Sequence, residues 1–292
     1  SGKGLANYTS IHMYPTAAGA TIEGNLDEDV IFLDGVDNFT IDGRVNLIGT
    51  SANLTISNTS SGNSARTIHL INDATYNVFR YCNIKGSQSN LKNGVLEFGQ
   101  NKGRGNDLGN SNNTVEYSIF TYSGANTSSA PATMIYSEGS GGKPNKNNTL
   151  TNNKFVDFFK SSSSSNGVYI GKNSSDFYIN NNSFYYTTTF TPSGDFTYRA
   201  ICVSDKSTEN ITINNNFIGG SQTESGGSAW IKTGGNTPFE GIYLLTGTNS
   251  KSNVYNNTIK NINWTNSSNE SWRAIYVNSG LVDVGTLGGN VI

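Results

Sequence analysis

The sequence has few of the residues from which metal sites, disulfide frameworks and charged interfaces are built. Its 292 residues include only 2 Cys, 2 His and 5 Pro, and 14% of them are charged, with a formal net charge of -2. No pair of Cys or His residues has metal-ligand spacing, and a near-neutral chain lacks the basic face that nucleic acid requires. No apolar run approaches the roughly 18 residues of a membrane span. We therefore expect no metal, no cofactor, no nucleic-acid partner and no membrane span.

Asparagine and glycine are abundant instead, with 43 Asn and 33 Gly. Both are poor in helix interiors, which argues against a helical protein. Only 34% of residues are hydrophobic, but aromatic residues reach 11% and lie in short alternating clusters such as Ala-Ile-Tyr-Val at 274–277. Disordered chains lack such clusters. The composition is typical of many short strands separated by polar turns.

A short apolar strand recurs eight times along the chain. The copies begin at Ile31, Ile68, Leu96, Met134, Val168, Ile201, Ile242 and Ile275. In each copy apolar residues alternate with period 2 rather than 3.6, so the repeat is made of strands and not of helices.

A second signal follows each strand: an Asn or a small polar residue precedes an apolar residue by two. This column reads Asn46, Cys82, Ser118, Asn153, Asn182, Asn216, Asn257 and Asn290, and successive members lie 29 to 41 residues apart. Asn tolerates the left-handed backbone of a sharp corner. Its amide can also donate to one neighbouring coil and accept from the other. We therefore predict a structural asparagine ladder of Asn46, Asn153, Asn182, Asn216, Asn257 and Asn290.

Strand repeats of about 35 residues without regular hairpin turns favour stacked coils over a propeller. The prediction is an all-β fold: one parallel β-helix (solenoid) of about eight coils with irregular loops, spanning residues 1–292. Residues 1–25 are expected to form an incomplete coil or a cap. Both ends of the stack would leave coil edges open to association.

The pattern ending in Ile213-Asn214-Asn215-Asn216-Phe217-Ile218 resembles the right-handed parallel β-helix repeats of the pectate-lyase-like superfamily. Three stretches, 36–44, 216–230 and 274–290, are similar to large secreted cell-surface proteins of Bacteroidetes-type bacteria. The resemblance implies an extracellular, cell-surface location and export by the type IX pathway. Because the sequence stops at Ile292, inside a repeat, we expect a segment of a longer chain with neighbouring domains.

Relatives of this fold include polysaccharide lyases and glycoside hydrolases, so carboxylates are the candidate catalysts. A hydrolase needs two carboxylates about 5 to 10 Å apart. Asp27, Glu28 and Asp29 are more typical of a solvated loop, and Asp42 before Gly43 is more typical of a turn. The sequence contains no Asp-Asp pair and no His-Gly pair. We assign no catalytic residue, and both histidines are expected to be uninvolved.

Alternation places the middle residues of the recurring strand on the outside. This outward column contains His69, Glu97, Tyr169, Cys202, Tyr243 and Tyr276, and its fourth member is either Ile135 or Tyr136. Its tyrosines could stack on sugar rings or only on one another. Trp230, Trp264 and Trp272 are expected in loops, where ligand sites concentrate. The candidate ligand-binding residues are therefore Tyr169, Tyr243, Tyr276, Trp230, Trp264 and Trp272.

The two cysteines, Cys82 and Cys202, lie four coils apart in this register. That is roughly 19 Å, which exceeds the reach of a disulfide, so two free thiols are expected and Cys82 should be partly buried. The sequence favours a non-catalytic structural or adhesive segment of an exported surface protein, with polysaccharide or another surface component as its partner. A carbohydrate-active enzyme with an unrecognised site is the alternative.

Overall fold

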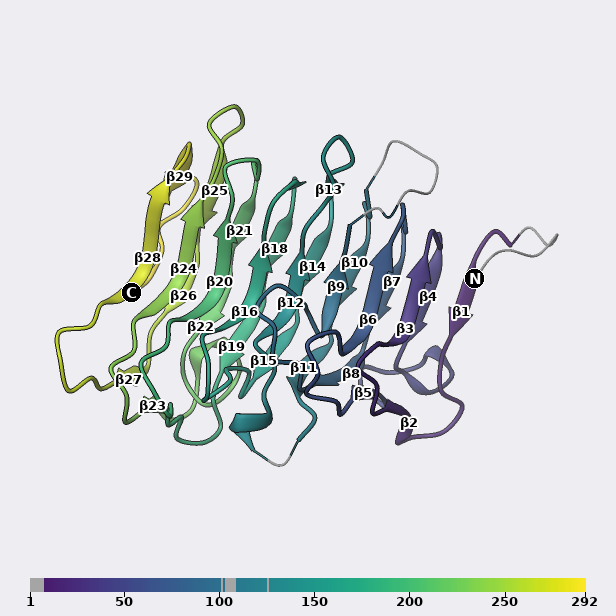
Figure 1. Cartoon of the computed structure of the whole chain (residues 1–292), viewed down its shortest axis with the longest axis horizontal. Helices are drawn as coiled ribbons and strands as arrows, with labels where there is room; N and C mark the ends of the chain where they lie inside the picture. The colour runs from purple at the N-terminus through teal and green to yellow at the C-terminus, as the bar shows by residue number, and fades with distance from the viewer. Residues whose placement is uncertain (1–7, 101, 103–108, 125) are drawn as a thin grey trace.

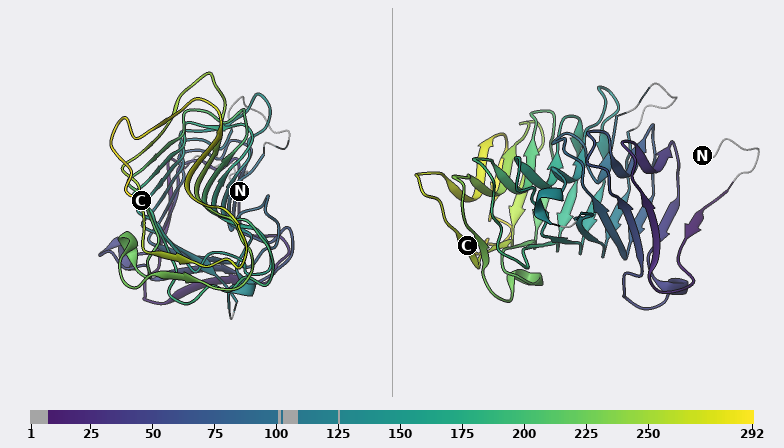
Figure 2. Two further views of the ribbon diagram at one scale, coloured as in Figure 1. Left: turned by 90° about the vertical axis from the view of Figure 1, so that its left-hand side faces the viewer. Right: turned by 60° about the horizontal axis from the view of Figure 1, so that its bottom comes forward.

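A computed structural model describes residues 8–100, 102, 109–124 and 126–292. Three long sheets, here named A, B and C, run the length of the molecule, and all their strands pair in parallel (Figure 1). The chain passes from sheet A to sheet B to sheet C and then begins the next coil. Eight such coils stack side by side, so the predicted all-β parallel β-helix is confirmed. Seen end-on, the coils superpose around one common interior (Figure 2).

Sheet A contains β1 (Ile11–Met13), β4 (Phe39–Asp42), β7 (Val78–Arg80), β10 (Thr114–Glu116), β14 (Thr149–Thr151), β18 (Tyr178–Asn180), β21 (Thr212–Asn214), β25 (Ser252–Tyr255) and β29 (Val282–Val284). Sheet B contains β2 (Ala20–Gly24), β5 (Leu54–Asn58), β8 (Cys82–Gly86), β11 (Ile119–Tyr122), β15 (Lys154–Val156), β19 (Ser183–Tyr185), β22 (Phe217–Ile218) and β26 (Thr258–Ile259). Sheet C contains β3 (Asp29–Asp34), β6 (Arg66–Ile71), β9 (Leu96–Phe98), β12 (Thr133–Ser137), β16 (Ser165–Ile170), β20 (Tyr198–Ser204), β24 (Phe239–Leu245) and β28 (Trp272–Ser279).

The turns between the sheets carry the remaining short elements. Two small parallel sheets form from β13 (Asn145–Lys146) with β17 (Ser174–Ser175) and from β23 (Trp230–Lys232) with β27 (Ile262–Trp264). Three single 3-10 turns are η1 (Val45–Leu47), η2 (Thr127–Ser129) and η3 (Thr223–Ser225). Within the described residues no helix is long and apolar enough to cross a membrane.

Equivalent residues of successive coils lie directly over one another. Ile201 pairs with Ile242, and Ile242 with Ile275, in parallel register. On the inner side of sheet B, Phe155 stacks on Phe120 at a centroid distance of 5.1 Å and on Phe184 at 4.4 Å. Columns of like side chains therefore fill the core, which explains how a chain of modest hydrophobic content can bury a continuous interior.

The corner between sheets A and B contains the asparagine ladder. The backbone N–H of Asn153 donates to Oδ1 of Asn182, and the same contact links Asn182 to Asn216, Asn216 to Asn257 and Asn257 to Asn290, at 3.0 to 3.1 Å. Each Nδ2 also donates to the Oδ1 of the next rung. These bonds satisfy polar groups that the core would otherwise leave unpaired.

The ladder prediction is wrong for Asn46. This residue is exposed and lies within η1, with a positive φ of 50°. This corner, between β4 and β5, is longer than the other A–B corners, and the register pairs Leu54, not Asn46, with Cys82. The 15-residue spacing that selected Asn46 counts across this insertion, so the ladder position of that coil is filled by an apolar side chain.

Two further asparagine ladders were not recognised in the sequence. Asn77 Nδ2 donates to Asn113 Oδ1, and Asn113 Nδ2 to Asn148 Oδ1, at 3.0 and 3.1 Å. A shorter pair joins the Asn110 N–H to Asn145 Oδ1 at 2.9 Å. Both lie between sheets C and A, where variable loops obscure the spacing. Asparagine therefore supports the second set of corners as well.

The start of the described chain completes a coil. β1 pairs with β4 and β2 pairs with β5, so residues 8–25, expected to form an incomplete coil or a cap, supply the first strands of sheets A and B. Residues 1–7 lie outside the described part. The first coil therefore contributes one strand to each of sheets A, B and C, as the later coils do.

Replacing one internal rung should be costly. In an Asn216→Ala variant, the N–H of Asn182 loses its acceptor, and the carbonyl of Ile179 and Oδ1 of Asn257 lose donors. Each buried group left unpaired costs about 1–3 kcal/mol, so we expect a loss of about 3 kcal/mol in urea unfolding. Asn263→Ala, at an exposed position of β27, is the control and should change stability by about 0.5 kcal/mol or less. Equal effects of the two changes would contradict the ladder's role.

Candidate functional site

The outer face of sheet C presents one column of side chains across all eight coils. We call it the outer column; the strand register gives its members as Phe32, His69, Glu97, Tyr136, Tyr169, Cys202, Tyr243 and Tyr276. The register resolves the ambiguity at the fourth copy, because Ile135 is paired with Leu96 on the inner side. Three of the predicted ligand-binding residues, Tyr169, Tyr243 and Tyr276, therefore share one face.

The tyrosines of the outer column pack on one another but remain partly open. Tyr136 and Tyr169 lie 5.4 Å apart between ring centroids, and Tyr243 and Tyr276 lie 5.5 Å apart. Tyr169, Tyr243 and Tyr276 are half-buried, whereas Tyr136 is buried. The hydroxyl of Tyr276 donates to Asn278 Oδ1, and Asn278 Nδ2 donates to the Tyr243 hydroxyl, both at 3.1 Å. Stacking and ligand contact are therefore compatible here.

Beside these tyrosines, two arginines flank one carboxylate. Arg199 Nε lies 2.5 Å and Arg273 Nη1 lies 3.0 Å from the two carboxylate oxygens of Glu240. The guanidinium of Arg199 also lies 4.4 Å from the centre of the Tyr243 ring, and that of Arg273 lies 4.1 Å from Tyr276. Cation–π contact of this kind fixes both ring and guanidinium. The result is a rigid aromatic and polar surface over the last three coils.

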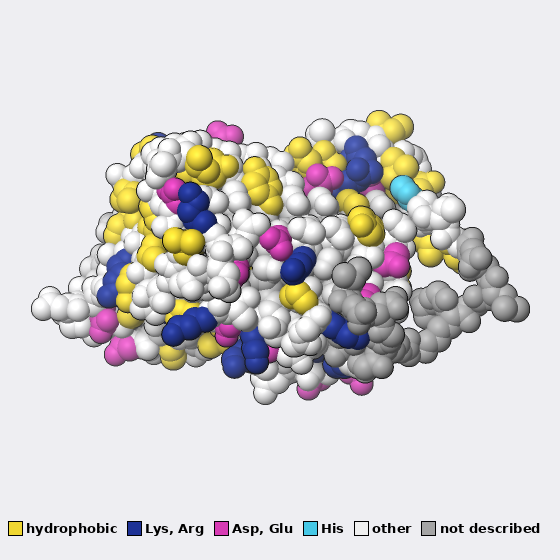
Figure 3. Space-filling model, turned by 90° about the horizontal axis from the view of Figure 1, so that it is seen from above, with side chains coloured by type: hydrophobic (Ala, Val, Ile, Leu, Met, Phe, Trp, Pro, Cys, Tyr) yellow, Lys and Arg dark blue, Asp and Glu magenta, His cyan; other side chains and the backbone are white. Residues whose placement is uncertain are grey.

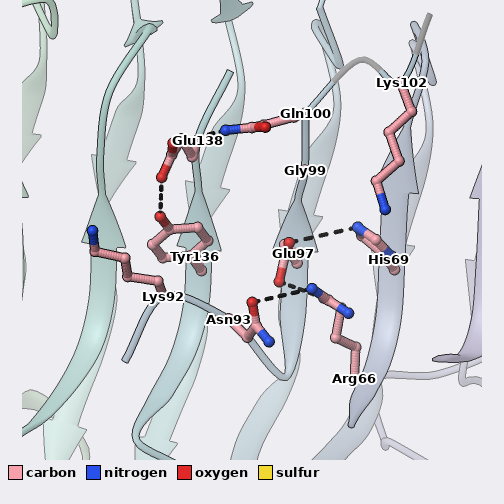
Figure 4. A pocket seen from close by; sticks show the side chains of 10 residues that line it. All are labelled: Arg66, His69, Lys92, Asn93, Glu97, Gly99, Gln100, Lys102, Tyr136 and Glu138. Atoms are coloured by element: carbon pink, nitrogen blue, oxygen red, sulfur yellow. Dashed lines mark hydrogen bonds and ion pairs between the residues drawn. The ribbon is translucent and has the colours of Figure 1, made fainter. Parts of the chain in front are cut away.

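A polar pocket of about 210 Å³ lies on the same face, over β6, β9 and β12 (Figure 4). Glu97 is its central carboxylate and accepts from Arg66 Nε at 2.6 Å. His69 lies between two acids, with Nδ1 2.9 Å from Asp29 Oδ2 and Nε2 3.5 Å from Glu97 Oε1. His69, expected to be uninvolved, thus points outward as predicted but belongs to a charged network that joins three coils.

The other wall of the pocket comes from Tyr136 and the loop that follows it. The Tyr136 hydroxyl donates to the Glu138 carboxylate, which also accepts from Gln100 Nε2 at 2.8 Å. Burial, and then the hydrogen bond to Glu138, raise the pKa of Tyr136, so this phenol remains protonated. Lys92 and Lys102 lie on either side of the two carboxylates (Figure 4). The pocket therefore offers donors and acceptors together, as a hydroxyl-rich ligand requires.

Only part of this pocket could be found from the sequence. Alternation places Glu97 and His69 in the outward column, but it does not show that they share a pocket. Glu138, Lys92 and Lys102 lie in turns outside the strands, where no period indicates direction. In the sequence, the outward column is the one feature that indicates where this pocket lies.

The tryptophan predictions need correction. All three residues lie in strands rather than in loops: Trp230 in β23, Trp264 in β27 and Trp272 in β28. Trp230 is fully buried and stacks on Tyr186 at 4.8 Å, so it cannot contact a ligand. Trp264 packs on Phe239 at 4.7 Å, and its indole N–H donates to the Thr237 carbonyl at 2.9 Å. Trp272 alone is exposed, at 40%.

Trp230 and Trp264 belong to an aromatic cluster between sheets B and C in the later coils. Its other members are Phe158, Phe159, Tyr186, Phe190, Tyr198 and Phe239. Thin solenoid cores do not need such a cluster, but long B–C turns must bury their own apolar surface. Aromatic rings suit this purpose because each removes a large area from water.

The acidic residues considered as catalysts have structural partners. Asp29 contacts His69 and Arg66. Asp42 is fully buried and accepts from Arg44 Nη2 at 2.6 Å and Arg80 Nε at 2.7 Å. Burial opposes ionisation of Asp42, but the hydrogen bonds from Arg44 and Arg80 outweigh it and lower its pKa. Asp42 therefore remains ionised and ties two coils together.

Both cysteines are free, as expected, and both are fully buried, including Cys82, which was expected to be only partly so. Burial raises the pKa of each thiol to about 12. Cys202 belongs to the outer column but is hidden among its neighbours, so alternation alone misjudged its exposure. Neither thiol has the exposed, electropositive setting of a reactive cysteine.

No group of three or more His, Cys, Asp or Glu side chains suited to a metal ion exists within the described residues. Charged side chains of both signs are scattered over the face in Figure 3 rather than segregated. Searches against protein-family models, curated proteins and solved structures each returned no match. The parallel β-helix is therefore established by the geometry of this chain itself.

Truncating Trp230 should destabilise the fold rather than remove a binding contact. Trp230→Ala empties the centre of the aromatic cluster and should cost about 3–5 kcal/mol. Trp272→Ala, at the exposed tryptophan, should cost well under half of that. Urea unfolding followed by circular dichroism measures both; similar losses would show that the cluster is not a core.

The buried thiols predict an alkaline loss of stability. The pKa of each folded thiol lies above its ordinary value of 9.0, so the buried thiols stabilise the fold fully below pH 9 and lose this contribution as the pH rises toward 12. In this window each thiol should contribute a decline of about 1.4 kcal/mol per pH unit. A Cys82→Ala/Cys202→Ala variant should show a shallower decline in unfolding free energy between pH 9 and pH 10.5. Parallel curves for variant and parent would contradict the prediction.

Proposed function

We propose that this protein is a rigid, non-catalytic segment of an exported cell-surface protein, and that the outer face of sheet C binds polysaccharide. The observation that carries the proposal is the outer column, in which Tyr169, Tyr243 and Tyr276 lie in register on one face. A repeating array suits a repeating polymer better than it suits a single small molecule.

The chemistry of this face supports a carbohydrate ligand. Sugar rings have flat apolar faces that pack on aromatic rings, and hydroxyl groups that both donate and accept. Tyr243 and Tyr276 supply the rings, while Asn278 and the Arg199–Glu240–Arg273 group supply fixed donors and acceptors. These groups are held by one another before any ligand arrives, so binding costs little additional ordering.

The similarity to secreted β-helix surface proteins supports the location. The stacked coils and their ladders make an extended body with little capacity for internal rearrangement, which suits a spacer or an adhesive stalk. Two free, buried thiols provide no disulfide that would argue for or against export. The proposal therefore includes a pectate-lyase-like β-helix and a location at the cell surface.

A polysaccharide-cleaving enzyme remains the second candidate because of the polar pocket. Glu97 and Glu138 line this pocket from neighbouring coils. A glycoside hydrolase uses two such carboxyl groups, one as the acid and one as the base. However, each carboxylate already accepts from a neighbour: Glu97 from Arg66, and Glu138 from Tyr136 and Gln100. These contacts favour a fixed binding surface over a proton-transferring pair.

The test is a binding and turnover assay on insoluble cellulose, chitin, xylan and mannan. We expect the protein to sediment with at least one polymer and to release no soluble sugar. Tyr243→Ala/Tyr276→Ala should weaken that binding about tenfold, since two stacking contacts of about 0.5–1.5 kcal/mol each are lost. Tyr178→Ala, at an exposed tyrosine on sheet A, is the control and should bind normally.

Two results would overturn the proposal. If the protein binds no polysaccharide on a broad glycan array, the proposal that polysaccharide is its ligand is wrong. Release of sugar that disappears in Glu97→Gln or Glu138→Gln would instead establish the enzyme.

A further inference from the structure

A second surface feature lies on a different face, at the corner where sheet A turns into sheet B. The corner residue of six successive coils has a left-handed backbone with φ between 50° and 55°; these residues are Tyr81, Tyr117, Asn152, Asn181, Asn215 and Asn256. Asn adopts this conformation readily, but for a bulky side chain it is strained. Two tyrosines therefore occupy positions that the other four coils give to asparagine.

These two tyrosines form a parallel stack along the solenoid. Their ring centroids lie 5.0 Å apart with an angle of 5° between the planes. Arg44, from the preceding coil, places its guanidinium 4.7 Å from the centre of the Tyr81 ring. The stack ends at Tyr117, because the next corner residue is the short Asn152. Tyr117 is 44% exposed although it could have been covered by another ring.

Where the next rings of the stack would lie, the surface is hollowed. A depression of about 430 Å³ is bordered by Tyr117 and runs across the outer side of sheet B to Phe217 and the η3 turn. The buried Ser183 also lines it, and as a small side chain it leaves room between Lys154 and Phe217, its neighbours in the register. The hollow therefore lies where two adjacent columns both contain a short side chain: Asn152 in the corner column after Tyr117, and Ser183 in the sheet B column between Lys154 and Phe217.

Polar groups around this hollow lack partners of their own. Within the described part of the chain, the side chains of Lys154, Asn181 and Glu224 make no hydrogen bond or ion pair. Lys154 supplies donors, Glu224 supplies acceptors, and Asn181 supplies both. The site carries one positive and one negative charge, so it matches a neutral ligand rich in hydroxyl groups.

A second strained segment forms the far border. Glu224 and Ser225 in η3 have φ of 60° and 56°, in the region that favours glycine. The Glu224 N–H donates to Ser183 Oγ at 3.2 Å, which attaches this turn to the floor of the hollow. Strained non-glycine residues cluster at ligand clamps and persist only where the surroundings hold them. Here strain occurs independently at both borders of one hollow.

We propose that this hollow is a second carbohydrate subsite, in which a neutral pyranose ring stacks on the open face of Tyr117 and continues the Arg44–Tyr81–Tyr117 stack. Hydroxyl groups of the sugar pair with Lys154, Asn181 and Glu224, and Phe217 contacts the next unit of the oligosaccharide. The subsite lies on a different face from the outer column and does not depend on polysaccharide binding to sheet C.

The test is isothermal titration of the whole protein with cellohexaose, laminarihexaose, mannohexaose and N-acetylchitohexaose at millimolar concentration. We expect at least one hexaose to bind and Tyr117→Asn to weaken it at least about tenfold. Asparagine occupies this corner in the four following coils, so the variant should fold with an undiminished melting temperature. Glu224→Gln should also weaken binding, whereas Tyr178→Ala should leave it unchanged. Tyr243→Ala/Tyr276→Ala should leave intact the part of the binding that Tyr117→Asn removes.

The outcomes separate this subsite from the face of sheet C. Absence of binding by all four hexaoses would overturn the subsite, as would binding that Tyr117→Asn leaves intact. Hexaose binding lost only in Tyr243→Ala/Tyr276→Ala would assign the ligand to sheet C and also overturn it. Retained polymer binding with no hexaose bound would overturn the subsite while leaving the proposed function standing.

Discussion

Each residue of a parallel solenoid lies over its own equivalents, about 4.8 Å away in the coils above and below. A side chain must therefore be compatible with a copy of itself or of whatever replaces it in the column. Asparagine meets this requirement because its amide both donates and accepts, as the bonds from Asn182 to Asn216 and from Asn216 to Asn257 show. Flat rings meet it by stacking, as Phe155 and Phe184 do. The composition of the chain follows from this one constraint.

Charged side chains do not meet the requirement, because like charges one coil apart repel. In this protein they alternate in sign along the solenoid instead. Glu240 lies between Arg199 and Arg273, and Asp42 accepts from both Arg44 and Arg80. In these two groups the charged side chains tie neighbouring coils together.

The parts of the structure that repeat could be predicted from the sequence, and the parts that interrupt the repeat could not. Alternation located the strands of sheet C and the outward tyrosines, and the Asn column located the ladder from Asn153 to Asn290. The prediction for Asn46 was wrong because the longer corner between β4 and β5 shifts the register by an amount that no spacing reveals. The prediction that Trp230 binds a ligand was wrong because the direction of a side chain between sheets B and C depends on the aromatic cluster that these segments form together. The polar pocket could not be predicted in full because Glu138 and Lys92 lie outside the strands, where alternation does not indicate the direction of a side chain.

The same constraint indicates where a ligand can bind. A column of like side chains satisfies its own hydrogen bonds and covers part of each ring, so it leaves a partner only the partly exposed rings, as in the outer column. Two of the hollows lie where a column changes residue type. The polar pocket lies where Glu97 gives way to Tyr136, and the hollow lies where Tyr117 gives way to Asn152. In both places a group built to be stacked or paired meets a neighbour of different shape and keeps part of its surface exposed. Both hollows therefore lie at irregular coils, and the regular coils hold them at a fixed distance from one another.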